Sequence, residues 1–280
     1  MNFFEFLKIL ILGIAEGITE FLPISSTGHL LILEQLLRPD CLKDAAFSEL
    51  FTVAIQLGAI LAVILIYFRQ LWPLGMTEEK RVIVKGPKVY LWLKIFIACI
   101  PAAIAGLLFD NLFDLFFHGR RSIITVMITL ILYGIVFLFI ERYSRENPPR
   151  YKTLGSIPMK LAVYIGCFQI LAMIPGTSRS GITIIGAMLL GASRGVATEF
   201  TFFLEIPTII GASLWKLIKY RFDFDGMQYA ILLCAMIVAF LVAFATVNWM
   251  IDYVKKHDFK VFGWYRIGLG LFLLFILLIT

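Results

Sequence analysis

Two short polar segments hold most of the side chains that could do chemistry in this chain. They are EFLPISSTGHL, residues 20–30, and IPGTSRSG, residues 174–181. In the first, Glu20 follows Glu16 by four residues, so the two carboxylates share one face of a helix. Because the surrounding sequence is apolar, the two acids need a cation, a shared proton or an aqueous cavity. The alternative is that they lie at a membrane interface, where water solvates them.

Both segments also combine helix starts with hydroxyl groups. Pro23 ends the helix before it, and the hydroxyl side chains that follow it are good N-caps for a second helix. A helix N-terminus with free N–H groups attracts anions, and Arg179 offers a planar fork suited to phosphate. The pattern predicts a phosphate-binding site, with a purely structural pair between Arg179 and an acid as the alternative. The predicted members are Ser25, Thr27, Thr177, Ser178, Arg179 and Ser180.

Ser26 and His29 complete the set of candidate catalytic groups. His29 lies three residues after Ser26 and near the two carboxylates, whereas the other two histidines fall in loops elsewhere. The imidazole could activate Ser26 as a base, protonate a leaving oxygen or attack phosphorus itself. The alternative is a structural role, which is the more common one for a lone histidine. The predicted catalytic residues are Ser26, His29, Glu20 and Arg179.

The elements that position these residues are built for lipid. Of the 280 residues, 60% are hydrophobic and 16% are charged, against about a quarter charged in a soluble domain. A membrane crossing needs about 20 apolar residues, and two interrupted apolar regions fit helical hairpins that enter and leave on one side. The sequence predicts one integral membrane domain, residues 1–280, of the all-α polytopic class. The six predicted transmembrane helices are 49–69, 91–109, 121–141, 199–218, 227–251 and 262–280, and the two re-entrant hairpins are 3–22 with 24–38 and 159–174 with 181–191.

The charged loops predict an orientation. Three basic loops, 69–90, 141–152 and 252–260, fall on one side of this arrangement, which the positive-inside rule makes cytoplasmic. Both termini then lie outside the cytoplasm. The net charge of +6 is explained by such loops, and we expect no nucleic-acid partner. We also expect no cleaved signal peptide and no disulfide or metal pattern from the four scattered cysteines. Four basic residues oppose the assignment: Arg120, Arg121, Lys219 and Arg221.

The two polar segments occupy equivalent places in an internal repeat. Pro23 and Ser26 match Pro175 and Ser178, each 152 residues further along the chain. The repeats, about 1–141 and about 159–280, each contain one hairpin and three spans. An odd number of spans inverts the second repeat, which is typical of transporters with broken helices. The charges are not repeated, because Glu16 matches Gln169 and Arg179 has no basic counterpart in the first half.

Over almost its whole length the chain resembles undecaprenyl-diphosphate phosphatase, the bacitracin-resistance family. The resemblance is carried by EGITEFLPISSTGH and PGTSRSG, and by FTVAIQLGAILAV (51–63), IPAAIAGLLF (100–109) and TEFTFFLEIPTIIGA (198–212). It implies hydrolysis of undecaprenyl diphosphate to undecaprenyl phosphate, which recycles the cell-wall lipid carrier. The positions that match the family's functional residues are Glu16, Glu20, Ser26, His29 and Arg179.

The resemblance further implies a divalent cation, Mg²⁺ or Ca²⁺, for which Glu16 and Glu20 are the predicted metal ligands. It implies a multi-pass protein of the bacterial plasma membrane with a site facing the periplasm. The expected partners are a polyprenyl diphosphate lipid and membrane lipids, with a homodimer left open. Glu205 departs from the small or neutral residue expected at its position, and its role is unexplained.

Two other classes of function remain open at the level of sequence. A secondary transporter or lipid flippase is suggested by the inverted repeat, and it would move substrate without releasing phosphate. A phosphatase of the phosphatidic-acid type is suggested by SSTGH and SRSG, although the second histidine and the basic first motif of that family are absent. A phosphatase that also moves its product is compatible with both. The sequence does not choose between Ser26, His29 and water as the attacking group.

Overall fold

The structure, a computed structural model, describes residues 3–76, 82–114, 119–220 and 224–279, and most of these residues are helical. Beyond the helices, the described part contains a two-stranded antiparallel sheet, β1 (Leu74–Met76) with β2 (Val82–Val84). The α-helices are α1 (Phe3–Thr19), α2 (Ser26–Leu37), α3 (Ala45–Ile66), α4 (Phe68–Leu71), α5 (Gly86–Asp114), α6 (Gly119–Glu146), α7 (Met159–Gln169), α8 (Arg179–Leu189), α9 (Arg194–Tyr220), α10 (Gly226–Lys256) and α11 (Lys260–Ile279). Short 3-10 helices cover Asp40–Lys43, Leu154–Ser156 and Ile170–Met173.

Six of these helices are long and apolar enough to cross a membrane: α3, α5, α6, α9, α10 and α11. They coincide with the six predicted spans, which confirms an all-α polytopic membrane protein. Most of the helices run several residues beyond the apolar stretches. For example, α5 begins at Gly86 and α9 at Arg194, because a helix continues into the interface where charged side chains can reach water.

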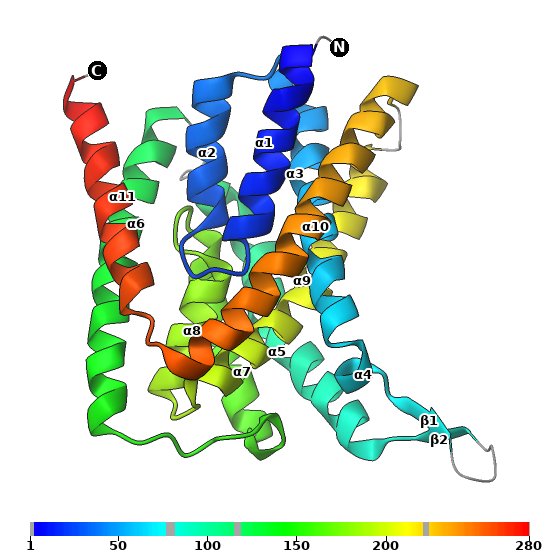
Figure 1. Ribbon diagram of the computed structural model, residues 1–280, viewed down its shortest axis with the longest axis vertical. Coiled ribbons are helices and arrows are strands. Elements are labelled where there is room, and N and C mark those ends of the chain that lie inside the picture. The colour runs from blue at the N-terminus through cyan, green and yellow to red at the C-terminus, as the bar shows by residue number, and fades with distance from the viewer. Residues whose placement is uncertain (1–2, 77–81, 115–118, 221–223, 280) are drawn as a thin grey trace.

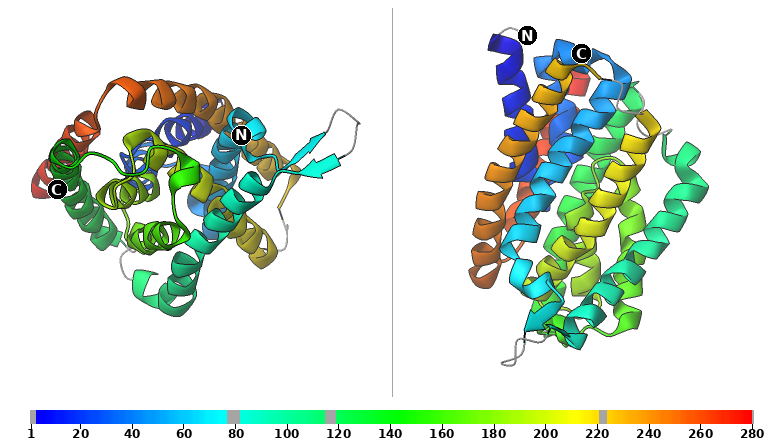
Figure 2. Two further views of the ribbon diagram at one scale, coloured as in Figure 1. Left: turned by 90° about the horizontal axis from the view of Figure 1, so that it is seen from below. Right: turned by 90° about the vertical axis from the view of Figure 1, so that its right-hand side faces the viewer.

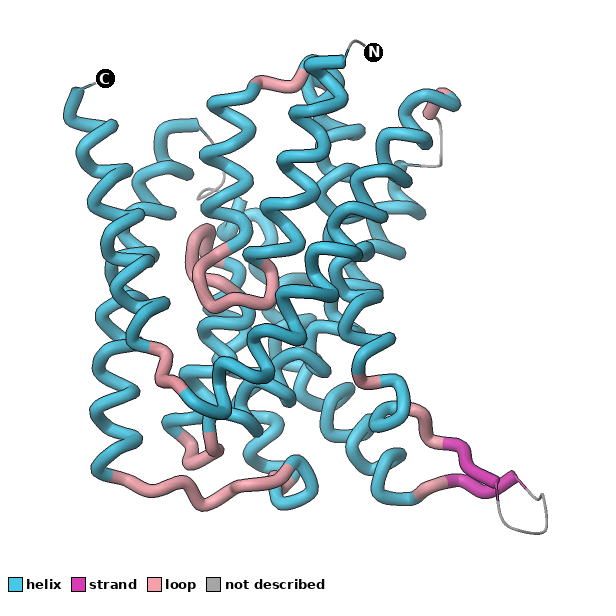
Figure 3. The backbone as a smooth tube through the Cα atoms, viewed as in Figure 1, coloured by secondary structure: helices cyan, strands magenta, loops and turns pink. Residues whose placement is uncertain are grey.

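The two remaining helix pairs form hairpins that approach each other from opposite ends of the molecule. α1 and α2 hang from the end that carries both termini, while α7 and α8 rise from the other end (Figure 1). Their connecting loops, residues 20–25 and 174–178, meet near mid-height (Figure 3). Seen along the long axis, the longer helices surround the hairpins (Figure 2). This arrangement suits the predicted inverted repeat, although the repeat and the re-entrant insertion into lipid remain predictions.

Glycines let each hairpin pack closely on a long helix of the other half. A Cβ on Gly13 of α1 would lie 3.0 Å from the carbonyl oxygen of Ala235 in α10. A Cβ on Gly166 of α7 would lie 2.0 Å from the carbonyl oxygen of Ala98 in α5. The two glycines match in the predicted repeat, and small residues allow the backbones of membrane helices to come close. Any larger residue at Gly166 would push α7 away from α5.

A buried ion pair ties three helices together at the end opposite the termini. The Glu141 carboxylate of α6 is fully buried and accepts hydrogen bonds from Arg194 Nε at 2.9 Å and from the Phe259 backbone N–H at 3.0 Å. It thereby joins α6 to the start of α9 and of α11. The described parts of the three basic loops also lie toward this end (Figure 1). Arg221, which opposed the orientation, lies outside the described residues.

Candidate active site

The two polar segments meet where a side chain of one donates to backbone carbonyls of the other. Ser180, at the start of α8, is fully buried, and its hydroxyl donates to the carbonyl oxygens of Glu20 at 3.0 Å and Leu22 at 3.3 Å. Residues 160 positions apart are therefore in direct contact. The hydroxyl of Ser180, predicted to bind phosphate, is used to join the loops.

Both loops end in a serine N-cap with an unusual backbone. Ser25 caps α2 by accepting from the Gly28 N–H at 3.2 Å, and Ser178 caps α8 by accepting from the Gly181 N–H at 3.1 Å. Their φ angles are +77° and +70°, a region that costs a non-glycine residue about 1–3 kcal/mol. The structural counterpart of Ser178 is therefore Ser25, one residue before the Ser26 that the sequence matched with it. The same strain at both N-caps indicates that the loops are built to aim the N-termini of α2 and α8 at one place.

Ser26 contacts a carboxylate and not the histidine. Its hydroxyl donates to Glu20 Oε2 at 2.5 Å. His29 instead has Nδ1 2.7 Å from the Ser25 carbonyl oxygen and Nε2 2.6 Å from the Tyr265 hydroxyl, and its ring stacks on Tyr265. Of the three roles that the sequence left open for His29, that of a base for Ser26 does not fit this geometry. Glu20 is the base within reach.

The other predicted phosphate-binding residues differ in exposure. Thr27 is exposed at the start of α2, while Thr177 is fully buried in the second loop. Ser178 Oγ lies 3.1 Å from Ser180 Oγ in addition to capping α8. Thr27 and Thr177 are therefore the hydroxyl residues of this set without a capping or loop-joining bond in the described structure.

Several buried polar atoms around the loops lack a hydrogen-bond partner within the described residues. They include both oxygens of Glu16 and of Glu205, Arg179 Nη1 and Gln169 Oε1. Glu16 therefore does not form the structural pair with Arg179 that was the alternative to phosphate binding. Buried polar atoms without partners are costly, so their concentration here indicates a place for a polar ligand.

A second buried cation lies beside the two loops. Sequence reasoning named only Arg179 there and missed this one. Arg266 of α11 is fully buried, and its guanidinium donates to the carbonyl oxygens of Pro23 at 3.1 Å, Gly176 at 2.9 Å and Thr177 at 3.0 Å. It thus holds both loops at once. Its neighbour Tyr265 holds His29. The available signal was a charged residue inside a predicted span.

The predicted metal ligands, Glu16 and Glu20, have carboxylate oxygens free for a divalent cation. Glu16 offers two buried carboxylate oxygens without partners, and Glu20 offers the oxygen that is not bonded to Ser26. Carboxylate oxygens suit Mg²⁺ and Ca²⁺. The described residues contain no group of three or more His, Cys, Asp and Glu placed to hold a metal. The side chains therefore fit a cation that takes its remaining ligands from phosphate and water, as Mg²⁺ commonly does.

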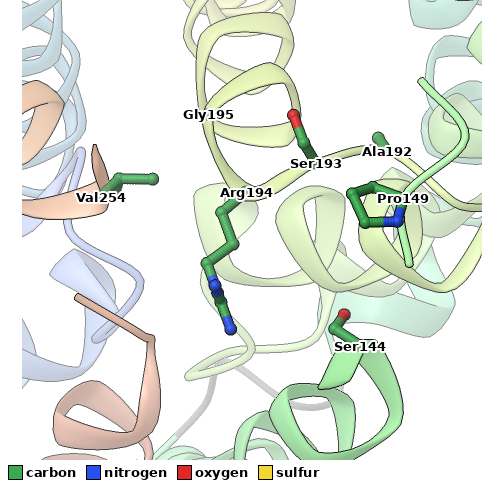
Figure 4. Close-up of a pocket in the computed structure, with 7 residues that line it drawn as sticks. All are labelled: Ser144, Pro149, Ala192, Ser193, Arg194, Gly195 and Val254. Atoms are coloured by element: carbon green, nitrogen blue, oxygen red, sulfur yellow. The ribbon is translucent and has the colours of Figure 1, made fainter. Parts of the chain in front are cut away.

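A separate cavity of about 250 Å³ lies where the α8–α9 turn approaches the ends of α6 and α10. Figure 4 shows its lining, which includes Ser144, Ser193 and Arg194. None of the predicted site residues lines it. Arg194 is hydrogen-bonded to Glu141. This cavity is therefore separate from the candidate active site.

Fold and site together define a polytopic membrane protein in which two buried loops place an arginine among carboxylates and hydroxyls. A family model described as bacitracin resistance protein BacA matches residues 9–272, and the chain belongs to this family. It is 51% identical to an undecaprenyl-diphosphatase of Lachnoclostridium phytofermentans over 96% of both chains. It is 47% identical to an undecaprenyl-diphosphatase of Enterococcus faecalis over 99% of this chain and 98% of that one. A third, of Streptococcus mutans, is 50% identical over 98% and 97%.

Proposed function

We propose that this chain hydrolyses undecaprenyl diphosphate to undecaprenyl phosphate and inorganic phosphate, which recycles the cell-wall lipid carrier and confers resistance to bacitracin. The names of its full-length relatives support the substrate. Two observations carry the reaction. The Ser26 hydroxyl is bonded to the Glu20 carboxylate. The Glu20 backbone in turn contacts Ser180, the residue after Arg179, whose buried Nη1 is without a partner in the described structure.

In the proposed reaction Glu20 accepts the Ser26 proton and the Ser26 oxygen attacks the terminal phosphorus. The new serine–phosphorus bond forms as the bridging oxygen–phosphorus bond breaks, and undecaprenyl phosphate leaves. Water then attacks the phosphoserine, releasing inorganic phosphate and restoring the hydroxyl. Arg179 and the N-termini of α2 and α8 stabilise the negative charge that develops on the phosphoryl oxygens. The alternative reaction is direct attack of water on the terminal phosphorus, without a phosphoserine.

The remaining predicted residues have supporting roles in this proposal. His29, fixed between the Ser25 carbonyl and Tyr265, carries a proton for the departing or entering oxygen. Glu16 and Glu20 hold the divalent cation, which when bound would neutralise diphosphate charge. Thr27 and Thr177 supply hydroxyl groups to the phosphate site. Ser25 and Ser178 cap the two helix starts, and Ser180 joins the two loops.

We further propose a location in the bacterial plasma membrane, with the site open to the outer side. The exposed apolar residues of the long helices provide the contact with lipid and with the polyprenyl tail, for example Leu107, Ile135 and Leu241. The basic loops at the opposite end support this orientation. A homodimer is compatible with the exposed helix faces.

Phosphate release from undecaprenyl diphosphate by the purified protein, with and without chelator, tests the function. We expect release that Ser26→Ala abolishes and that requires the divalent cation. A phosphoserine trapped by acid quench on Ser26 would distinguish attack by serine from attack by water. Movement of lipid across a vesicle membrane without phosphate release would instead favour the transporter.

A further inference from the structure

The ribbon formed by β1 and β2 has an apolar face that the described part of the chain leaves exposed. In its antiparallel register Leu74 pairs with Val84, and Val82 lies two residues before Val84, so these three side chains share one face. Leu74, Val82 and Val84 are 39%, 64% and 65% exposed. Two strands alone are only marginally stable in water unless another surface covers them. The ribbon is therefore a candidate contact surface.

A lysine covers part of the opposite face of the ribbon. Gly75 pairs with Ile83 on that face, and a Cβ on Gly75 would lie 2.5 Å from Lys85 Cε. The Lys85 side chain therefore lies along the backbone of β1. The ribbon thus has one wholly apolar face and a second face that Ile83 shares with a cation. This division is typical of amphipathic segments that lie in the interface of a membrane.

The position of the ribbon favours a lipid surface as its partner. The ribbon lies between two candidate membrane spans, Ala45–Ile66 and Gly86–Phe109. It projects sideways at the end opposite the termini (Figure 1), and seen along the long axis it extends beyond the surrounding helices (Figure 2). A segment that leaves the protein sideways at the end of a span lies over the lipid that surrounds the protein.

Aromatic residues at the base of the ribbon support this placement. Phe68 of α4 and Trp72 stack with 5.2 Å between their ring centroids, and both rings are about half exposed. Tyr90, in the first turns of α5, is also about half exposed. Tryptophan and tyrosine collect at the headgroup level of membranes, where their rings have an apolar body and a polar edge. The base of the ribbon therefore lies at the depth of the headgroups.

The charge around the ribbon favours anionic lipid. Within the described residues of the segment 68–90, the charged side chains are Arg69, Lys85 and Lys88, and none is acidic. Lys88 also donates to the carbonyl oxygen of Arg69, which ties the start of α5 to α4. The turn 77–81 lies outside the described residues, and its two acids and two bases cancel in charge. Basic segments beside a membrane span are attracted to anionic headgroups.

We propose that the ribbon docks on the lipid surface beside the helices and binds anionic phospholipid there. Leu74, Val82 and Val84 face the acyl chains, and the cations lie among the headgroups. The contact goes beyond the phosphatase reaction and requires neither its substrate nor its turnover. A second copy of the chain fits this surface less well, because two ribbons of net positive charge repel each other.

Depth-dependent quenching in lipid nanodiscs tests the contact. A fluorophore is placed on Val84→Cys in the full chain without its four native cysteines, in discs of phosphatidylcholine with and without phosphatidylglycerol. We expect quenching by a nitroxide on the upper acyl chain, and stronger quenching when phosphatidylglycerol is present. The matched control is Lys152→Cys, an exposed residue of the loop that follows α6, whose fluorescence this quencher should not change. Equal quenching at the two positions would overturn the proposal.

Reversal of charge tests the choice of lipid. Arg69→Glu/Lys85→Glu replaces two exposed cations and should abolish the additional quenching that phosphatidylglycerol produces. Arg142→Glu, at an exposed pair on α6, should retain it. If the doubly reversed variant does not fold, high salt tests the same attraction in the parent protein, because salt screens exposed charges.

Two results would contradict this choice of partner. Additional quenching that survives charge reversal or high salt would overturn the selection of anionic lipid. A disulfide between two copies of the Val84→Cys protein, with no quenching by lipid, would assign the apolar face to a second copy of the chain instead. Neither readout depends on phosphate release, so a failure of the proposed function would leave the test of the ribbon intact.

Discussion

Arg179 is the residue at which a structural role and a role in phosphate transfer can be separated most sharply. If it stabilises charge in the transition state, Arg179→Ala should lower kcat by roughly 10²–10³-fold. Arg179→Lys should fail to restore it, because an ammonium group cannot reproduce the planar fork. The measurement is kcat together with the melting temperature of each variant. A well-folded Arg179→Ala protein with nearly normal turnover would contradict the phosphate-binding role and favour the transporter.

The two acids of α1 and its following loop give a second prediction for single residues. Glu16→Gln should raise the concentration of divalent cation needed for half-maximal activity, because it removes carboxylate ligands. Glu20→Gln should also abolish turnover, since Ser26 loses its base. The matched control is Glu34→Gln, a partly buried acid on α2, for which we expect the wild-type cation requirement. Full activity in the Glu16→Gln/Glu20→Gln double variant would leave both acids with a structural role.

Among the secondary-structure elements, α11 makes the most specific structural prediction. Arg266→Ala leaves three buried loop carbonyls without their donor, at a cost of about 1–3 kcal/mol for each unsatisfied group. We expect a large fall in melting temperature and little rescue by Arg266→Lys, whose single ammonium cannot span the same carbonyls. Arg142→Ala, at an exposed pair on α6, is the control and should be nearly neutral. An unchanged melting temperature in Arg266→Ala would contradict the role of α11 in holding the loops.

The elements were predictable from sequence because a membrane helix is specified by the length and apolarity of one segment. The hairpins were indicated by their polar interruptions. Arg266 was not predicted, since its partners are backbone carbonyls 243 and 90 positions away, and backbone atoms leave no complementary residue type to search for. The bond between Ser26 and Glu20 was missed because it spans the loop between α1 and α2. Residue spacing does not reveal the path of this loop, which includes a positive φ at Ser25.

For the whole molecule, the prediction concerns sidedness. In a variant without the native cysteines, cysteines at the exposed positions Lys85 and Lys256 should react with an impermeant maleimide only after the membrane is broken. Cysteines at Lys43 and Met227, in the segments near the other end (Figure 1), should react in intact cells. The basic loops determine this expectation. Labelling of Lys85 and Met227 from the same side would contradict the predicted topology and the outward-facing site.

The contacts of Arg266 also bear on how such a site could change during evolution. Because its hydrogen bonds go to carbonyl oxygens, which every amino acid supplies, the part of the junction that Arg266 makes does not depend on the identity of the loop side chains. Mutations at Thr27 or Thr177 could therefore alter which headgroup is accepted while the two hairpins stay in register. A library that varies these two threonines with Arg266 fixed should retain more folded members than one in which Arg266 is also varied. The residues that could change specificity, Thr27 and Thr177, are thus different from the residue that holds the loops, Arg266.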